Sequence, residues 1–375
     1  MKKAVVIPDS FKGTLTSREI CTIISDKINK HFPDCRVISI PVADGGEGSV
    51  DCFLWALGGE KVYEIVSSPY FEDMEAFYGL IGDTGVVEMA ACAGLPLVEG
   101  RKNPNLTTSY GVGQLIMAAV KKGCKKIIVG LGGSCTNDGG CGAAAAAGIK
   151  FYDKEGKEFI PVGKTLIDID RIDFTHRAKE LDEIEIITMC DIDNPMYGPE
   201  GAACVFGPQK GADEKMVREL DRGLEHLCRV IERETGKNLK DVPGTGAAGA
   251  MGAGMIAFFD SVLQMGIETV LDTVKFDELI ADADMIFTGE GRFDKQSLRG
   301  KVVIGVGKRA KNKNIPVTVI AGGAHKNIEE AYDMGISSIF TINRLPEDFG
   351  ISRYKSKENL EATIDNILRL IKSIR

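Results

Sequence analysis

Residues 1–20, MKKAVVIPDSFKGTLTSREI, already contain the structural pattern that the rest of the chain repeats. The apolar run Ala4–Ile7 ends at Pro8 and is typical of a short buried strand. Thr16-Ser17-Arg18-Glu19 is a capping box, in which the hydroxyl and the carboxylate each accept a hydrogen bond from a free N–H at the start of a helix. The loop Asp9–Gly13 lies between them. A strand, a polar loop and a helix in this order indicate an α/β protein.

Both ends of the chain show this order. Apolar runs alternate with amphipathic segments, and we expect strands at residues 4–7, 36–42, 62–66, 285–288, 316–321 and 338–342, with a closing helix at 357–374. Neither end has enough strands for a sheet of its own. We therefore expect residues 1–69 and 271–375 to combine into one doubly wound parallel-sheet (flavodoxin-like) α/β domain.

Residues 70–270 then form an inserted mixed α/β domain. It should contain a hairpin at 77–81 and 85–90, strands at 126–131 and 185–190, and a long amphipathic helix at 213–234. Several polar loops of the chain follow strands and precede helices, which places them at the carboxyl edge of a sheet, where ligands bind. We expect the active site in the cleft between the two domains.

Composition excludes several classes of partner. The net charge of −8 argues against nucleic acid, whose binders carry basic patches. No apolar stretch reaches the ~18 residues of a membrane span, and the apolar run before Pro8 is too short for a signal peptide. The ten cysteines include no Cys-x-x-Cys pair, as expected for reduced thiols. We expect a cytoplasmic enzyme of small molecules without a nucleic-acid or membrane partner; a homo-oligomer is left open.

Five loops carry the polar chemistry. They are Asp9–Gly13, Asp44–Gly48, Gly132–Gly140, Asp191–Pro195 and Gly289–Lys301. Glycine lets backbone N–H groups approach a phosphate closely, carboxylates hold magnesium or take protons, and lysine neutralises phosphate oxygens. The combination predicts phosphoryl transfer. The chain has no Walker A sequence, no His-Arg-Asp and no Asp-Phe-Gly, so it belongs to neither common class of phosphotransferase.

Two motifs have rival interpretations. Gly244–Gly249 matches the dinucleotide pattern Gly-x-Gly-x-x-Gly, which would suggest an NAD-dependent hydroxy-acid dehydrogenase, but no strand precedes it as that fingerprint requires. We interpret it as a glycine loop that opens a tightly packed helix. Asp191 and Asp193 can offer two oxygen ligands to a cation, or either Asp193 or Asn194 can stabilise an Asx-turn before Pro195. A non-catalytic sugar-acid-binding protein is the remaining alternative, although no output module is visible.

Taken together, the five segments resemble the glycerate kinase family of bacterial type. The matching stretches are Pro8–Gly13, Ala43–Gly48, Gly130–Gly140, Cys190–Pro195 with Gly207–Ala212, and Gly289–Gly291 with Asp294–Ser297 and Gly300-Lys301. They occur in family order across essentially the whole chain. Cys135, where alanine is more usual, and Arg292-Phe293 depart from the pattern without changing the polar residues.

The resemblance implies ATP-dependent phosphorylation of D-glycerate to 2-phosphoglycerate, less often to the 3-phospho isomer, with Mg²⁺. It also implies two α/β domains, one of them built from both chain ends. The roles of the residues come mainly from their chemistry. We expect Asp191 and Asp193 as metal ligands; Gly132, Gly133, Ser134, Asn137, Asp138, Gly289, Glu290 and Gly291 as nucleotide-binding residues; and Ser10, Lys12, Ser297 and Lys301 as substrate-binding residues.

The catalytic residues follow from the same argument. Asp44 is the preferred base for the glycerate hydroxyl and Asp294 is its rival. Lys12 or Lys301 neutralises charge on the transferred group, and Asp191 acts through the metal.

Overall fold

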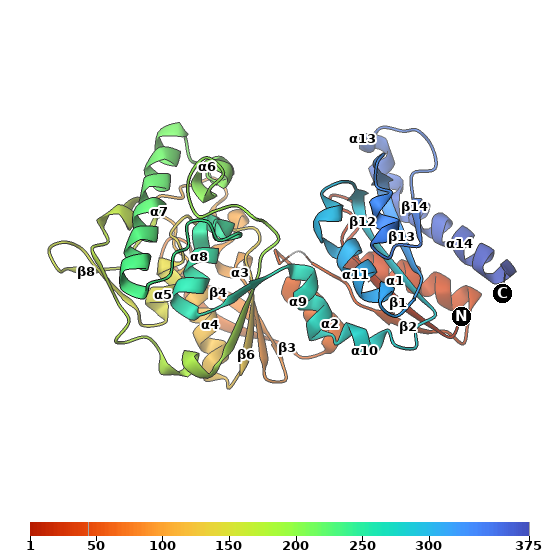
Figure 1. Ribbon diagram of the computed structural model, residues 1–375, viewed down its shortest axis with the longest axis horizontal. Coiled ribbons are helices and arrows are strands. Elements are labelled where there is room, and N and C mark those ends of the chain that lie inside the picture. The colour runs from red at the N-terminus through yellow and green to blue at the C-terminus, as the bar shows by residue number, and fades with distance from the viewer. Residues whose placement is uncertain (44, 375) are drawn as a thin grey trace. The chain divides into compact units, whose positions relative to one another are not determined.

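The computed structural model describes residues 1–43 and 45–374, apart from the side chain of Arg299. The chain divides into two compact units. Unit 1 comprises Met1–Asp44, Trp55–Leu57 and Met265–Arg375, and unit 2 comprises Gly45–Leu54 and Gly58–Gln264. Figure 1 labels helices and strands of both units.

Unit 1 is built on a parallel sheet. Its described elements are β1 (Lys3–Pro8), α1 (Ser17–His31), β2 (Arg36–Ser39), α9 (Gly266–Thr273), α10 (Phe276–Leu279), β12 (Met285–Phe293), η5 (Ser297–Arg299), α11 (Val302–Lys311), β13 (Val317–Ala324), α12 (Glu330–Asp333), β14 (Ser338–Thr341), α13 (Phe349–Ser352), η6 (Arg353–Lys355) and α14 (Ser356–Ile374). The strand order within these residues is β14-β13-β12-β1-β2, and every neighbouring pair is parallel.

The two faces of this sheet are covered by different helices. Ala4 and Val6 of β1 pack with Phe287 of β12 against α1 and α14. Val5 and Ile7 point to the opposite face, because side chains alternate along a strand, and α11 contacts β1, β12 and β13 there. From β1 the chain moves outward to β2, and from β12 it moves the other way to β13 and β14. The sheet is therefore doubly wound, and its order reverses between β1 and β12.

The capping box predicted at the start of α1 is confirmed. The Thr16 hydroxyl accepts a hydrogen bond from the backbone N–H of Glu19 at 3.2 Å, and the Glu19 carboxylate accepts one from the backbone N–H of Thr16 at 2.9 Å. These bonds satisfy N–H groups that the first turn of the helix leaves free.

Unit 2 combines a mixed sheet with a smaller one. Its described elements are α2 (Ser49–Leu57, whose last three residues belong to unit 1), β3 (Glu60–Ser67), β4 (Asp73–Ile81), β5 (Thr84–Glu88), α3 (Ala90–Ala93), η1 (Leu95–Val98), α4 (Tyr110–Lys121), β6 (Lys126–Gly130), α5 (Cys141–Ala146), β7 (Lys150–Tyr152), β8 (Glu158–Phe159), η2 (Gly163–Asp168), β9 (Arg171–Asp173), η3 (Lys179–Glu183), β10 (Glu185–Met189), α6 (Ala202–Phe206), η4 (Pro208–Lys210), α7 (Glu214–Thr235), α8 (Ala247–Phe259) and β11 (Val262–Gln264).

The larger sheet of unit 2 has the strand order β11-β10-β6-β5-β4-β3 within the described residues, and β8-β7-β9 form the smaller one. Strands β11, β10, β6 and β5 pair with one another in parallel, whereas β4 pairs antiparallel with both β5 and β3. The hairpin predicted around residues 82–84 is β4–β5. The predicted fold class, a mixed α/β protein with parallel sheets, is confirmed.

One strand is paired differently from our expectation. The strand predicted at 62–66 lies within β3, which we expected to join the parallel sheet of the chain ends, but it pairs antiparallel with β4, from Glu60 opposite Leu80 to Ser67 opposite Asp73. Only five residues separate β3 from β4. A connection this short permits antiparallel neighbours, while parallel neighbours need a crossover of a dozen residues or more.

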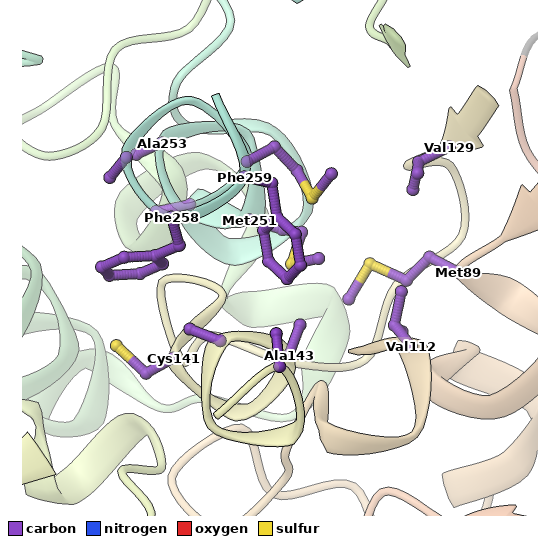
Figure 2. Packing of buried hydrophobic residues seen from close by; sticks show 14 of the residues in the cluster. Met89, Val112, Val129, Cys141, Ala143, Met251, Ala253, Phe258 and Phe259 are labelled. Atoms are coloured by element: carbon purple, nitrogen blue, oxygen red, sulfur yellow. The ribbon is translucent and has the colours of Figure 1, made fainter. Parts of the chain in front are cut away.

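The core of unit 2 lies where α8 packs against α5 and the sheet. Figure 2 shows Met251, Phe258 and Phe259 of α8 with Cys141 and Ala143 of α5, all of which belong to one buried cluster. Phe258 meets Phe151 of β7 edge to face, with ring centroids 5.9 Å apart. This packing fixes the helices that follow the functional loops.

Within residues 1–43 and 45–374, no helix is both long and apolar enough to cross a membrane.

Candidate active site

Three loops of unit 2 begin side by side at one edge of its larger sheet. Glu88, the last residue of β5, is paired with Gly130, the last residue of β6, and Gly130 is paired with Met189 at the end of β10. The segment Gly132–Gly140 and the carboxylates Asp191 and Asp193 therefore follow neighbouring parallel strands. This carboxyl edge is where open α/β sheets bind ligands.

The segment Gly45–Gly48 packs directly on this edge. The backbone N–H of Gly132 donates to the Gly45 carbonyl oxygen at 2.9 Å. A Cβ on Gly130 would lie 2.4 Å from that same oxygen, and one on Gly132 would lie 2.5 Å from the Cα of Gly46. These glycines are required because two backbones touch. Asp44, the preferred base, lies outside the described residues.

A buried lysine holds the glycine loop in place. Lys210 is 2% exposed, and its Nζ donates to the Ser134 hydroxyl at 2.9 Å and to the Thr136 carbonyl oxygen at 2.7 Å. Burial lowers the pKa of Lys210 to about 8. Gly133 has φ +74°, and a Cβ there would meet only the Ala90 Cβ at 3.7 Å, so the surroundings of this residue are open.

Asp138 supports the loop from inside. Its fully buried carboxylate accepts hydrogen bonds from the Ser109 backbone N–H at 2.7 Å and hydroxyl at 2.8 Å, and from the backbone N–H groups of Gly140 at 3.2 Å and Gly142 at 3.3 Å. Burial raises the pKa of Asp138, and these four donors oppose that rise. The carboxylate thus connects the starts of α4 and α5, which is a structural task.

The neighbouring side chain, Asn137, is buried without hydrogen bonds. Asn137 is completely buried, yet neither its amide oxygen nor its amide nitrogen has a hydrogen-bond partner among the described residues, and the same holds for the Thr136 hydroxyl. Buried polar atoms in native proteins almost always have partners. These three atoms are therefore the groups of the loop that can receive a ligand or an ordered water.

The predicted metal ligands lie at the end of β10. Asp191 is half-buried and Asp193 is exposed. Burial raises the pKa of the Cys190 thiol to about 11, with both carboxylates adding to the rise, so both negative charges lie near it. Asn194 fixes the loop through two hydrogen bonds. Its side-chain amide donates to the Glu200 carbonyl oxygen at 2.8 Å, and its backbone carbonyl oxygen accepts from the Gly246 backbone N–H at 3.0 Å.

In the described part of the chain, no cluster of three or more His, Cys, Asp or Glu side chains could hold a metal ion. Two carboxylates nevertheless fit Mg²⁺ at a nucleotide, because this ion binds one or two protein carboxylates and takes its other ligands from phosphates and water.

The segment that matches the dinucleotide pattern has a structural role. Ala248, Gly249 and Ala250 are all left-handed, with φ of 56°, 68° and 65°. Gly249 accepts a hydrogen bond from Gly139 at 3.1 Å, while Gly246 donates to Asn194. The segment thus connects the glycine loop with the carboxylate loop, and α8 follows it as expected.

In unit 1 the predicted polar residues gather where the strand order reverses. The Asp9 backbone N–H, just after β1, donates to the Gly289 carbonyl oxygen of β12 at 2.8 Å. A Cβ on Gly291 would lie 3.2 Å from the backbone nitrogen of Lys12. The loop after β1, which carries Ser10 and the exposed Lys12, therefore lies against the carboxyl half of β12.

Our expectation of a glycine loop at 289–300 is wrong for its first part. Gly289, Glu290 and Gly291 lie within β12, which pairs with β13 as far as Phe293. A Cβ on Gly289 would lie 2.0 Å from the Ile320 carbonyl oxygen. Close packing between the two strands is therefore enough to require glycine at position 289, and a phosphate contact is not needed to explain it.

Glu290 is the buried acid of this region. It is 8% exposed, and its Oε1 has no hydrogen-bond partner among the described residues. Burial raises the pKa of Glu290 to about 7; Asp9 and Asp294 add to the rise, while a hydrogen bond from Ser297 and the charge of Lys301 oppose it. The exposed Lys301 lies at the start of α11.

Asp294 and Ser297 form a turn. The Asp294 backbone N–H donates to the Ser297 hydroxyl at 3.0 Å, and its carboxylate accepts from the Gln296 backbone N–H at 2.9 Å. Arg292 lies 3.5 Å from the same carboxylate. Part of the acceptor capacity of Asp294 is therefore used within the turn.

Comparison with known proteins decides the family. The glycerate kinase family model matches residues 4–372. The chain belongs to the glycerate kinase family. It is 42% identical to a glycerate kinase of Bacillus cereus over 97% of each chain, and 42% identical to glycerate 2-kinase of Escherichia coli over 91% of this chain and 90% of that protein. A crystal structure assigned as glycerate kinase 2 from Salmonella typhimurium LT2 matches with a TM-score of 0.88 and 38% identity, over 99% of this chain and 98% of that one.

Membership of the glycerate kinase family confirms the resemblance identified from the sequence, and the chain is therefore a kinase. Lys210 is not among the site residues predicted from the sequence, although it lies in the matching stretch Gly207–Ala212. Its position in that motif was the available signal, and only the structure shows the buried ammonium bonded to Ser134. Nothing in the sequence distinguishes the satisfied Asp138 from the unpartnered Asn137.

Proposed function

We propose that this member of the glycerate kinase family transfers the γ-phosphoryl group of ATP to D-glycerate, giving 2-phosphoglycerate and ADP, with Mg²⁺ required and the reaction taking place in the cytoplasm. The observation that carries the proposal is the pairing of Gly130 with Met189, which brings the glycine loop and two carboxylates to one sheet edge. The Escherichia coli relative is named as a glycerate 2-kinase, which supports the position of transfer.

In unit 2 the groups fit a nucleotide phosphate with its ion. We propose that the backbone N–H of Gly133, the Ser134 hydroxyl and the unpartnered Asn137 amide bind phosphate oxygens. The N–H of Gly132 already donates to the Gly45 carbonyl oxygen, so Gly132 supports this loop rather than donating to the phosphate. Asp191 and Asp193 would hold Mg²⁺, which neutralises charge on the β- and γ-phosphates. Asp138 acts in this proposal by supporting the loop, since four protein donors already surround its carboxylate.

In unit 1 the groups fit a small hydroxy acid. We propose that Ser10, Lys12, Ser297 and Lys301 bind the glycerate carboxylate and hydroxyls, and that Lys12 or Lys301 stabilises negative charge on the transferred group. Gly289 and Gly291 stay predicted phosphate contacts, with less support now that they lie in a strand. For the base, the sequence predicts Asp44, with Asp294 as its rival, and Asp44 lies outside the described residues.

The deciding experiment is an ADP-release assay coupled to a reporter reaction, with D-glycerate, ATP and Mg²⁺. We expect ADP release that depends on both glycerate and Mg²⁺, and phosphorus NMR should show the phosphoryl group on the 2-hydroxyl. Release without glycerate, or none at all, would contradict the proposal. Transfer to the 3-hydroxyl would change only the identity of the proposed product.

NADH binding tests the alternative of a dehydrogenase. NADH should leave the protein fluorescence unquenched, since helix α7 and not a strand is the element before Gly244.

A further inference from the structure

Glu290 occupies the position at which a doubly wound sheet presents ligands. It lies in the carboxyl half of β12, next to the point where the strand order reverses between β12 and β1. The backbone of the loop after β1 reaches it from the other side, since Asp9 is bonded to Gly289 and Lys12 lies beside Gly291. The loop that carries Ser10 and Lys12, which we propose for glycerate binding, therefore lies along one side of Glu290, and Ala321 of β13 is paired with Glu290 on the other.

One carboxylate oxygen of Glu290 is available to accept a proton, because no donor of the described residues is bonded to it. It is 8% exposed, and its Oε1 has no hydrogen-bond partner in the part of the chain that the structure describes. A buried carboxylate oxygen without a donor costs free energy that a structural role would not explain. An acceptor hydroxyl that donates to this oxygen would satisfy it.

The charged groups that face Glu290 come from the elements around it. Asp9 follows β1, Asp294 follows β12, and Lys301 precedes α11, while Ser297 donates a hydrogen bond from η5. Burial is the strongest influence and raises the pKa of Glu290 to about 7. A base with a pKa near the working pH is ionised in a large fraction of molecules and still accepts protons well.

Glu290 fits this role better than Asp294, which is one of the two bases that the sequence predicts. The carboxylate of Asp294 already accepts from the Gln296 backbone and lies beside Arg292. A nucleotide-binding role for Glu290 itself is disfavoured, because an ionised carboxylate repels phosphate.

We propose that Glu290 is the general base for the acceptor hydroxyl of glycerate, an inference that rests on the proposed function. As the hydroxyl oxygen forms its bond to the γ-phosphorus, the bond from that phosphorus to the bridging oxygen of ADP breaks. The hydroxyl O–H bond breaks, and its proton passes to Oε1 of Glu290. After the product leaves, the carboxyl group releases the proton to water.

The test is the pH profile of kcat/KM for D-glycerate at saturating Mg-ATP, in wild type and Glu290→Gln. In wild type we expect activity to fall on the acid side of pH ~7, since the base must be ionised. Glu290→Gln should lower kcat by about 10²–10⁴-fold, and its activity should no longer fall on the acid side of pH ~7 (the acidic limb of the profile). Its affinity for Mg-ATP should not change. An ordinary carboxylate base would place the limb near pH 4.

Asp294→Asn and Asp44→Asn are the matched carboxylate variants, and both should keep a limb near pH 7. Circular dichroism checks the fold of each variant. Titration of the Glu290 carboxyl carbon by NMR in wild type needs no variant, and a midpoint near 4 would overturn the inference. A Glu290→Gln kcat within about threefold of wild type, or an unchanged limb, would also overturn it while leaving the kinase proposal intact. A wild type without glycerate-dependent ADP release would contradict the proposed function and the inference together.

Discussion

Buried polar side chains in this protein differ in whether the protein itself satisfies them. Lys210 and Asp138 are buried and hydrogen-bonded, and they hold the loop Gly132–Gly140 in one conformation. Asn137 and Glu290 are also buried, but atoms of their side chains have no partner among the described residues. An unmade hydrogen bond in a protein interior costs about 1–3 kcal/mol. A ligand that makes those bonds recovers this free energy on binding.

Glu290 should make stability depend on pH in a definite direction. Its pKa is about 7 in the folded protein, compared with 4.5 for the free side chain. Between these pH values the folded state binds more protons than the unfolded state, so the free energy of unfolding falls as pH rises from about 4.5 through 7. The shift corresponds to roughly 3 kcal/mol. Relative to wild type, Glu290→Gln should therefore become more stable by up to about 3 kcal/mol between pH 4.5 and pH 8.

Urea unfolding of both proteins at pH 4.5, 6 and 8 measures this difference directly. Because both share all other titrating groups, their difference isolates Glu290. A difference that is constant with pH would show that Glu290 ionises as easily in the folded protein as in water.

At the scale of elements, the left-handed turn at the start of α8 explains why its sequence is rich in glycine. A Cβ on Gly249 would lie 2.0 Å from the Thr136 carbonyl oxygen, so the turn presses its backbone against the loop that carries Asn137. Ala248 and Ala250 accept left-handed conformations, which cost roughly 1–2 kcal/mol each for a residue with a Cβ. Strain of this size persists only where the surrounding packing fixes it.

Gly249→Ala should therefore destabilise unit 2 strongly. Gly236 is a matched control, since its φ of +72° is close to the +68° of Gly249, but a Cβ there would meet nothing within 4 Å. Both variants add the same methyl group and the same backbone strain. We expect Gly249→Ala to lose at least about 2 kcal/mol more than Gly236→Ala, because only the former forces a backbone shift. Chemical denaturation measures both, and equal losses would contradict the packing argument.

Elements with a regular apolar pattern could be predicted from the sequence. The capping box of α1, the hairpin β4–β5 and the amphipathic helix α7 all form where periodicity or turn residues indicated them. Strand β12 was predicted too short, because Gly289 and Gly291 interrupt the pattern that identifies a strand. Those glycines are instead required by neighbouring backbones. The left-handed turn could not be predicted, since its conformation depends on contact with a loop more than 100 residues away in the chain.

At the scale of the whole molecule, the order of strands determines which motifs come together. The sequence correctly predicted that the polar loops follow strands, and parallel pairing then places them at common edges. It could not show which of several carboxylates is buried and unpartnered, because burial depends on packing from distant segments. Asp294 and Glu290 are only four residues apart in the chain, yet only Glu290 lies within the strand.

The proposed roles divide between the two units, and this division is testable in the full-length protein. The groups proposed for Mg²⁺ and most of those proposed for phosphate lie in unit 2, and those proposed for glycerate lie in unit 1; the predicted phosphate contacts Gly289 and Gly291 are the exception, in unit 1. Asp191→Asn should lower kcat by about 10²-fold or more and weaken Mg-ATP binding, because metal and electrostatic contributions dominate phosphoryl transfer. Its affinity for glycerate alone should stay within twofold. Glu214→Gln controls for loss of a charge in the same unit, because the side chain of Glu214 is 95% exposed.

Lys12→Met is the complementary variant in unit 1. Loss of a charge-assisted hydrogen bond to the glycerate carboxylate should raise the Kd for glycerate by about tenfold or more, since such bonds contribute about 1.5–3 kcal/mol. The Kd for Mg-ATP should not change. Isothermal titration calorimetry with each ligand alone separates the two effects from catalysis. If Asp191→Asn weakened glycerate binding as much as Mg-ATP binding with the fold intact, the assignment of one substrate to each unit would be wrong, because the carboxylate would then also support the acceptor.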